Sequence, residues 1–273
     1  MGKIFTWDEI RAGKIPTYES FNLVASTIRD SFLIEQSIVT ALLFGSVVRG
    51  DSNQRSDIDC LVLYKTEHER LAIEAMHRVD RIAHSLHVPI NFTPCDTILG
   101  KTRLHHVGSS FIRHLQASID AGGIIKGTID EHLAATISVD QEIESYIKMK
   151  MYSMQESFAQ MTSFSDEKMA AFLKKAMESM THVARKMLIY EGLLEGDSKR
   201  QVQVSYRKAM PVELSSLFDS LLESDAWYSS ELEEQIRNPN EERYTVTLST
   251  LQIKVPEVLE FLRRNILRLD KNV

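Results

Sequence analysis

The sequence predicts an α/β domain followed by an all-α helical bundle, and three observations lead to this fold class. Short apolar runs typical of buried strands alternate with amphipathic helical patterns over residues 1–128. Long helical patterns without clear strand alternation fill residues 129–273. The length of 273 residues fits one large domain or two ordinary ones. We therefore expect a domain boundary between residues 128 and 129.

Composition excludes several classes of protein before any motif is considered. Apolar residues make up 43% and charged residues 26%, as in globular proteins, so a disordered or low-complexity chain is not expected. No apolar run approaches the ~18–20 residues of a membrane span, and no secretory signal is visible. The two cysteines, Cys60 and Cys95, cannot form a disulfide framework. We therefore expect a cytoplasmic protein.

The net charge of −6 is unevenly distributed along the chain. Residues 1–128 carry 14 basic and 14 acidic side chains, whereas residues 129–273 carry 18 and 24. An acidic chain is a poor general nucleic-acid binder, because phosphate contacts need lysine and arginine. The acidic second half is compatible with a solvated helical surface or with attraction of a cationic partner.

The elements of the first half can be justified in order. Apolar residues recur at helical spacing over residues 17–32, and Thr17 is placed to cap this helix. Residues 38–44 form a short apolar run that predicts a buried strand ending at Gly45. A turn-rich segment follows, and residues 57–64 predict a second buried strand.

Three further elements complete this half. Residues 69–86 have the apolar stripe of a helix. Residues 88–93 predict a third strand, with Pro89 at its start and Pro94 ending it. Residues 109–121 predict another helix before the short segment 122–127.

The second half is predicted to be mainly helical. The apolar residues of segment 244–248 alternate with polar ones, which is compatible with a short strand. The expected helices cover residues 139–161, 166–191, 211–222 and 256–269.

The chemistry is concentrated at the start of the second strand. Side chains alternate along a strand, so Asp57 and Asp59 point to the same face. Two carboxylates there repel each other and are costly to desolvate. A divalent cation between them removes both problems, and such oxygen ligands suit Mg²⁺, which completes its shell with water and phosphate.

Gly45 and Ser46 supply the complementary half of the site. Glycine at a strand end allows a tight turn and close approach of a ligand to the backbone. If Ser46 opens a short helix, its N–H groups can bind an anion, and its hydroxyl adds a donor. The sequence therefore predicts a site for a magnesium-bound nucleotide.

The segment LFGSVVRGDSNQRSDIDCLVL resembles the signature of the nucleotidyltransferase superfamily, which includes polymerase-β-like and aminoglycoside nucleotidyltransferases. The family pattern is a hydrophobic strand, Gly-Ser, about ten residues, then Asp-hydrophobic-Asp in a second strand. The resemblance spans roughly residues 21–127. The matching positions are Gly45, Ser46, Arg49, Gly50, Ser56, Asp57, Ile58 and Asp59.

The resemblance implies an α+β nucleotidyltransferase catalytic domain with a small mixed sheet over residues 1–128. Residues 129–273 would form a helical substrate-binding or interaction domain. In the implied reaction a substrate hydroxyl attacks the α-phosphorus of a nucleoside triphosphate, and pyrophosphate leaves. Asp57 and Asp59 would bind Mg²⁺ and act catalytically, and Gly45 and Ser46 would bind the β- and γ-phosphates. Arg49 is either a phosphate contact or a member of a surface salt bridge.

The chain departs from the family pattern at the third carboxylate, because the corresponding position on the third strand is Asn91. An amide oxygen can ligate a metal, but it cannot accept a proton at neutral pH. Three explanations remain open. Asp96 folds back into the site, Glu142 or Glu144 of the helical domain acts as the base, or the protein binds nucleotide with little or no turnover.

The leading expectation is an enzyme that transfers a nucleoside monophosphate, with ATP as the expected donor and AMP as the transferred group. The acceptor would be a hydroxyl of a small molecule, and the acidic second half fits a cationic one such as an aminoglycoside. The alternatives are a catalytically weak or inactive regulatory or antitoxin-like module with a protein partner, or a protein adenylyltransferase. Membrane and nucleic-acid partners are not expected.

Overall fold

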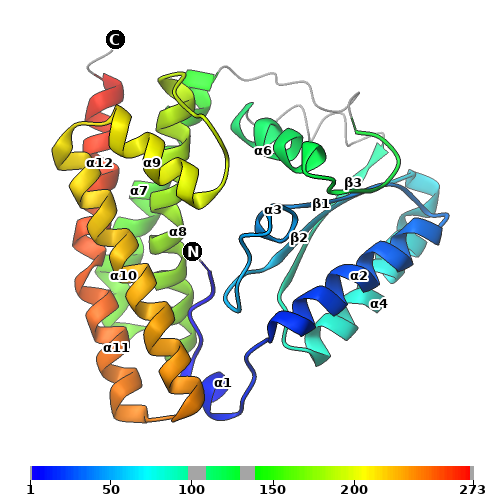
Figure 1. Ribbon diagram of the computed structural model, residues 1–273, viewed down its shortest axis with the longest axis horizontal. Coiled ribbons are helices and arrows are strands. Elements are labelled where there is room, and N and C mark those ends of the chain that lie inside the picture. The colour runs from blue at the N-terminus through cyan, green and yellow to red at the C-terminus, as the bar shows by residue number, and fades with distance from the viewer. Residues whose placement is uncertain (1, 98–108, 130–138, 271–273) are drawn as a thin grey trace. The chain divides into compact units, whose positions relative to one another are not determined.

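The computed structural model describes residues 2–97, 109–129 and 139–270 (Figure 1). The chain divides into two compact units, one formed by Ile15–Val139 and the other by Met1–Lys14 with Asp140–Val273. The first unit contains the sheet, and the described part of the second is helical. No helix of the described residues is both long enough and apolar enough to span a bilayer.

The first unit is built on a four-stranded sheet with strand order β3-β2-β1-β4. β1 (Ile38–Phe44) pairs antiparallel with both β2 (Ile58–Tyr64) and β4 (Ile124–Lys126). β3 (Ile90–Asp96) runs parallel to β2, and α4 (Glu69–Ser85) makes the crossover between them. The sheet is therefore small and mixed, as predicted.

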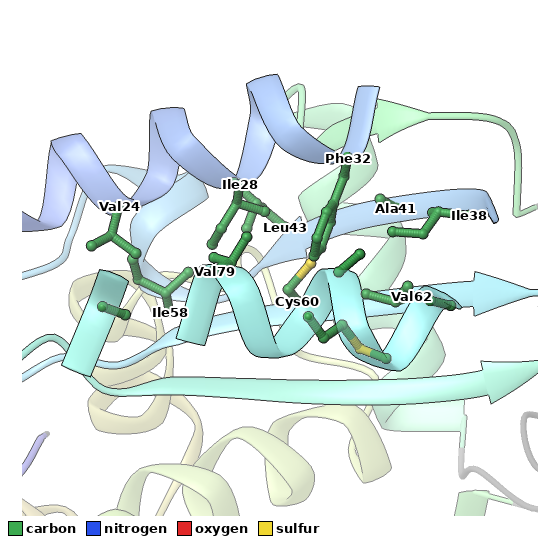
Figure 2. Packing of buried hydrophobic residues seen from close by; sticks show 14 of the residues in the cluster. Val24, Ile28, Phe32, Ile38, Ala41, Leu43, Ile58, Cys60, Val62 and Val79 are labelled. Carbon is green, nitrogen blue, oxygen red and sulfur yellow. The ribbon is translucent and has the colours of Figure 1, made fainter. Parts of the chain in front are cut away.

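One face of the sheet is covered by α4 and by α2 (Tyr18–Ile34), and Figure 2 shows Ile28 and Phe32 packed over the strand residues. Thr17 caps α2 as predicted, because its side chain accepts a hydrogen bond from the N–H of Ser20. Burying each large apolar side chain stabilises the fold by roughly 1.5–3 kcal/mol. The strand residues on this face include Ile58, Cys60, Val62 and Tyr64.

A second core lies on the opposite face, where α6 (Ser109–Asp120) contributes Leu115. The ring of Phe111 meets the ring of Phe44 edge-on, with centroids 5.7 Å apart. Because side chains alternate along a strand, Asp59 shares this face of β2 with buried Leu61. The aspartate therefore lies at the edge of a well-packed core.

β3 differs from its predicted bounds. It begins at Ile90 and continues through Pro94, which pairs with Val62, whereas the sequence predicted that Pro94 ends the strand. β3 is an edge strand, so a residue without an N–H group can be accommodated on its unpaired side.

The helical unit has a core in which the aromatic rings of Tyr206, Phe218 and Phe261 contact one another. The Tyr206 hydroxyl donates a 2.9 Å hydrogen bond to Oδ1 of buried Asn265. The helices are α1 (Trp7–Arg11), α7 (Val139–Gln160), α8 (Asp166–Tyr190), α9 (Lys199–Ala209), α10 (Val212–Arg237), α11 (Glu241–Ile253) and α12 (Val255–Asp270) (Figure 1).

The predicted strand over residues 244–248 is wrong, because this segment lies inside α11. Its side chains are buried at helical spacing, with Tyr244, Leu248 and Leu251 on the inner face. Asn240 caps the helix by accepting a 2.8 Å hydrogen bond from the N–H of Arg243. Alternation over only five residues is too short to distinguish the period of a strand from that of a helix.

The N-terminal segment also differs from the expected division of the chain. We placed residues 1–14 with the first domain, but they pack in the helical unit. The N–H of Phe5 donates a 3.0 Å hydrogen bond to the Tyr228 hydroxyl, and the Trp7 ring lies 5.9 Å from that of Tyr244. The expected functional division into a catalytic and a substrate-binding domain stays a prediction.

Candidate active site

Strand pairing brings two aspartates and an asparagine together. Asp59 is the second residue of β2, and Asp57 lies two positions earlier on the same side. Asn91 of β3 is the parallel partner of Asp59 across the sheet. The three polar side chains therefore project from one face at the beginning of two neighbouring strands.

The amide of Asn91 bridges the two carboxylates. Its Nδ2 atom donates a 2.8 Å hydrogen bond to Oδ2 of Asp57 and a 3.2 Å hydrogen bond to Oδ1 of Asp59. Asn91 is exposed, and both aspartates are half-buried. A neutral donor shared by two anions offsets part of their mutual repulsion without adding a charge.

Gly45 directly follows β1, whose last residue, Phe44, pairs with Asp59. The φ angle of Gly45 is +82°, a backbone conformation that residues other than glycine rarely adopt. A β-carbon at this position would lie 2.9 Å from Oδ2 of Asp59. The backbone conformation and the close approach of the carboxylate therefore both require glycine here.

Ser46 opens a short helix, as predicted. α3 (Ser46–Arg49) is a single turn that ends at Gly50 in the left-handed conformation. The N–H of Arg49 donates to the carbonyl of Gly45 at 3.3 Å, which closes the turn. The first N–H groups of a helix have no acceptor within the helix, so this turn presents donors beside the aspartates.

Arg49 takes part in an ion pair. Its Nε atom lies 3.5 Å from Oδ1 of Asp51, and the two side chains are 13% and 24% exposed. This agrees with the salt-bridge alternative, although the pair is more buried than a surface contact. A phosphate contact by Arg49 stays a prediction.

Arg55 and Asn53 were missed by the sequence analysis. Arg55 is only 4% exposed, and its backbone N–H donates a 2.9 Å hydrogen bond to Oδ1 of Asn53. The N–H of Asn53 donates to Oγ of Ser56, and the N–H of Ser56 donates to the carbonyl of Asn53, both at 2.9 Å. This turn leads directly into Asp57. The Asn-x-x-Ser spacing is the signal that could have revealed the turn.

The structure does not bring Asp96 to the aspartates. Asp96 is the last residue of β3 and pairs with Tyr64, at the opposite end of β2 from Asp59. At about 3.3 Å per residue, Asp96 lies roughly 16 Å along the strand from Asn91. A continuous paired strand cannot fold back over that distance. The prediction that Asp96 supplies the missing carboxylate is therefore wrong.

Glu142 and Glu144 lie on α7 in the helical unit. Glu142 forms a 2.5 Å ion pair with Lys186, and both side chains are largely buried. Burial lowers the pKa of Lys186, although the hydrogen bond to Glu142 opposes this shift. Glu144 is paired with Lys148 one helical turn away. A role of either glutamate as the general base stays a prediction.

The thiol of Cys60 lies on the other side of β2 from the aspartates, inside the core beneath α2 and α4 (Figure 2). Burial raises the pKa of this thiol, and the charge of Asp59 adds to the shift. Cys60 is therefore a neutral core residue.

The donor set fits Mg²⁺ in type. Within residues 2–97, 109–129 and 139–270, no group of three or more His, Cys, Asp or Glu side chains is arranged to hold a metal ion. The anionic oxygens at the site are those of the Asp57 and Asp59 carboxylates, which the amide nitrogen of Asn91 contacts. Mg²⁺ commonly uses one or two carboxylates and completes its shell with water and substrate phosphates.

The comparison with protein families agrees with the resemblance seen in the motif. Residues 27–95 match the family model described as Polymerase beta, Nucleotidyltransferase. No curated protein matches the chain. Among solved structures, spectinomycin adenyltransferase AAD(9) from Enterococcus faecialis, crystallised with ATP and spectinomycin, is 14% identical. The match covers 88% of this chain and 99% of that one, with a TM-score of 0.40.

The matched segment contains Gly45, Ser46, both aspartates and Asn91. The expected polymerase-β-like nucleotidyltransferase domain is thus confirmed for the part of the chain that carries the candidate site.

Proposed function

We propose that this protein is a Mg²⁺-dependent nucleotidyltransferase that moves a nucleoside monophosphate from a nucleoside triphosphate to a hydroxyl group and releases pyrophosphate. The observation that carries the proposal is the placement of Asp59 on β2 and of Asp57 just before it, on the same face and beside the turn at Gly45. The family match over residues 27–95 supports a transferase of this class.

Each residue of the site has a role in this reaction. Asp57 and Asp59 would hold Mg²⁺, which neutralises phosphate charge when it is bound. Gly45 lets phosphate oxygens approach the backbone, and Ser46 donates its hydroxyl and its N–H to them. These groups hold the triphosphate in place, so that catalysis depends mainly on position and charge.

ATP is the donor that we propose, with AMP as the transferred group. The acceptor is a small molecule with a hydroxyl group, and a cationic compound such as an aminoglycoside fits the acidic residues 129–273. The amide of Asn91 cannot take the proton of that hydroxyl at neutral pH. Glu142 and Glu144 are the candidates for this task.

A second candidate function is favoured by Asn91 itself. Without a third carboxylate at the position of Asn91 on β3, the same site could bind nucleotide as a regulatory or antitoxin-like module that turns over poorly. Transfer of AMP to a protein differs from the leading proposal only in the size of the acceptor.

The test is pyrophosphate release from each of ATP, GTP, CTP and UTP with Mg²⁺ and a panel of hydroxyl-bearing acceptors, cationic ones included. We expect the Asp57→Asn/Asp59→Asn double variant to lose turnover and Mg²⁺-dependent nucleotide binding. Asp80→Asn, on the exposed side of α4, is the matched control and should behave as wild type. Turnover retained in the double variant would contradict the proposal, and binding without turnover would favour the regulatory module.

A further inference from the structure

We propose that Asn91 is a positioning residue that holds Asp57 and Asp59 as a pair of carboxylates which, without nucleotide, bind one divalent cation rather than two. This inference rests on the proposed function, because it concerns the same site. It follows from the hydrogen bonds between the amide and the carboxylates, from the charge of these three side chains, and from the close approach of Asp59 to Gly45.

The amide of Asn91 uses both of its N–H groups. A primary amide nitrogen carries two hydrogens, and here its two acceptors are Oδ2 of Asp57 and Oδ1 of Asp59. A planar amide cannot turn its oxygen towards the same point while both hydrogens are donated. In this arrangement Asn91 fixes the carboxylates and is not itself a metal ligand.

These hydrogen bonds distinguish the two oxygens of each carboxylate. Oδ1 of Asp59 accepts from Asn91, whereas its Oδ2 atom faces the position that a β-carbon of Gly45 would occupy, at 2.9 Å. Oδ2 is therefore directed towards the turn that begins α3. The carboxylate of Asp59 therefore contacts Asn91 through Oδ1 and faces the turn before α3, on the side of the proposed phosphate site, through Oδ2.

The charge of Asp57, Asp59 and Asn91 together limits the number of cations that they can hold. The two aspartates contribute a formal charge of −2, and the amide contributes none. Two-metal sites hold their cations about 3.5–4 Å apart, so in the absence of substrate phosphates they need additional anionic protein ligands to offset the repulsion between the ions. A third carboxylate on β3 would supply that charge, and Asn91 stands in its place beside Asp59.

The experiment is a titration with Mn²⁺, followed by the electron paramagnetic resonance signal of the free ion, on the full chain without nucleotide. Wild type should bind one Mn²⁺ per chain, and Asp57→Asn/Asp59→Asn should bind none at this site. Asn91→Asp should bind Mn²⁺ about tenfold more tightly and take up a second ion, because each added anionic ligand raises affinity. Asn91→Ala should bind its single ion about threefold to tenfold more weakly.

Asn22→Asp is the matched control, because it makes the same chemical change on an exposed position of α2. It should leave both the number of ions and their affinity unchanged. Circular dichroism of every variant establishes that the fold is retained. This is expected because Asn91 is exposed on an edge strand.

Two bound ions in wild type would overturn the inference, as would equal Mn²⁺ affinity in wild type, Asn91→Ala and Asn91→Asp. Pyrophosphate release is measured separately on the same samples. Turnover with two ions per chain would contradict the inference but support the proposed function. One ion per chain without turnover would support the inference while the proposed function failed.

Discussion

The backbone of Gly45 lies so close to Asp59 that a β-carbon there would be 2.9 Å from the Oδ2 atom of the carboxylate. We therefore predict that Gly45→Ala displaces the Asp59 side chain and weakens Mg²⁺-dependent nucleotide binding by at least about tenfold. The positive φ of +82° adds a loss of about 1–3 kcal/mol in the free energy of unfolding. Nucleotide titration and chemical denaturation measure the two effects separately.

Gly122 provides the control for this substitution. Its φ of +81° is almost the same, but a β-carbon at Gly122 would meet no atom within 4 Å. Gly122→Ala should therefore lose stability because of its positive φ but keep wild-type nucleotide binding. If both variants bind nucleotide equally well, the contact between Gly45 and Asp59 does not shape the site.

The turn before β2 should affect catalysis through the position of Asp57. Oδ1 of Asn53 accepts a hydrogen bond from the backbone N–H of Arg55, so Asn53→Ala removes a hydrogen bond that orders the turn. We expect a loss of about 0.5–1.5 kcal/mol in stability and a several-fold lower turnover. Asn53→Asp retains an acceptor oxygen and should restore most of the turnover. An Asn53→Ala variant with wild-type kinetics would show that the turn does not position Asp57.

Whether a feature could be predicted depends on how far apart in the sequence the interacting residues lie. β1 matched its predicted bounds because its apolar run ends at Gly45, and the cap of α2 was visible in Thr17. The shared face of Asp57 and Asp59 followed from strand alternation alone. These features depend on neighbours in the sequence.

Other features depended on pairing between distant segments. The bridge from Asn91 to both aspartates requires the register of β3 against β2, which no local pattern contains. The distance of Asp96 from the site has the same origin. The burial of Arg55 was not expected, because arginine side chains are mostly exposed.

The stability of the helical unit should depend on the hydrogen bond between Tyr206 and Asn265. Both residues are fully buried, and the hydroxyl donates to Oδ1 at 2.9 Å. Tyr206→Phe leaves that oxygen without this donor and should lower the free energy of unfolding by about 1–3 kcal/mol. The Tyr206→Phe/Asn265→Leu double variant replaces both partners with apolar groups and should recover part of the loss. A double variant whose loss equals the sum of the single losses would show that the bond contributes nothing.

The ion pair between Glu231 and Arg243 should contribute a pH-dependent part of the stability. Arg243 donates to both carboxylate oxygens, at 2.8 and 3.1 Å, and these hydrogen bonds lower the pKa of Glu231 below its ordinary value of 4.5. A depressed carboxyl pKa means that the stabilisation is present above about pH 4.5 and is lost as the pH falls through the folded-state pKa.

We therefore expect Glu231→Gln to unfold at a lower denaturant concentration than wild type at pH 7. The difference should be small, about 0.2–1 kcal/mol, because Arg243 is partly exposed and solvent screens the pair. The gap between the two proteins should narrow as the pH falls below about 4.5, because Glu231 then becomes protonated, first in the unfolded and then in the folded state of wild type. Denaturation curves across this range measure the effect, and a gap that stays constant with pH would rule out the ion pair as its cause.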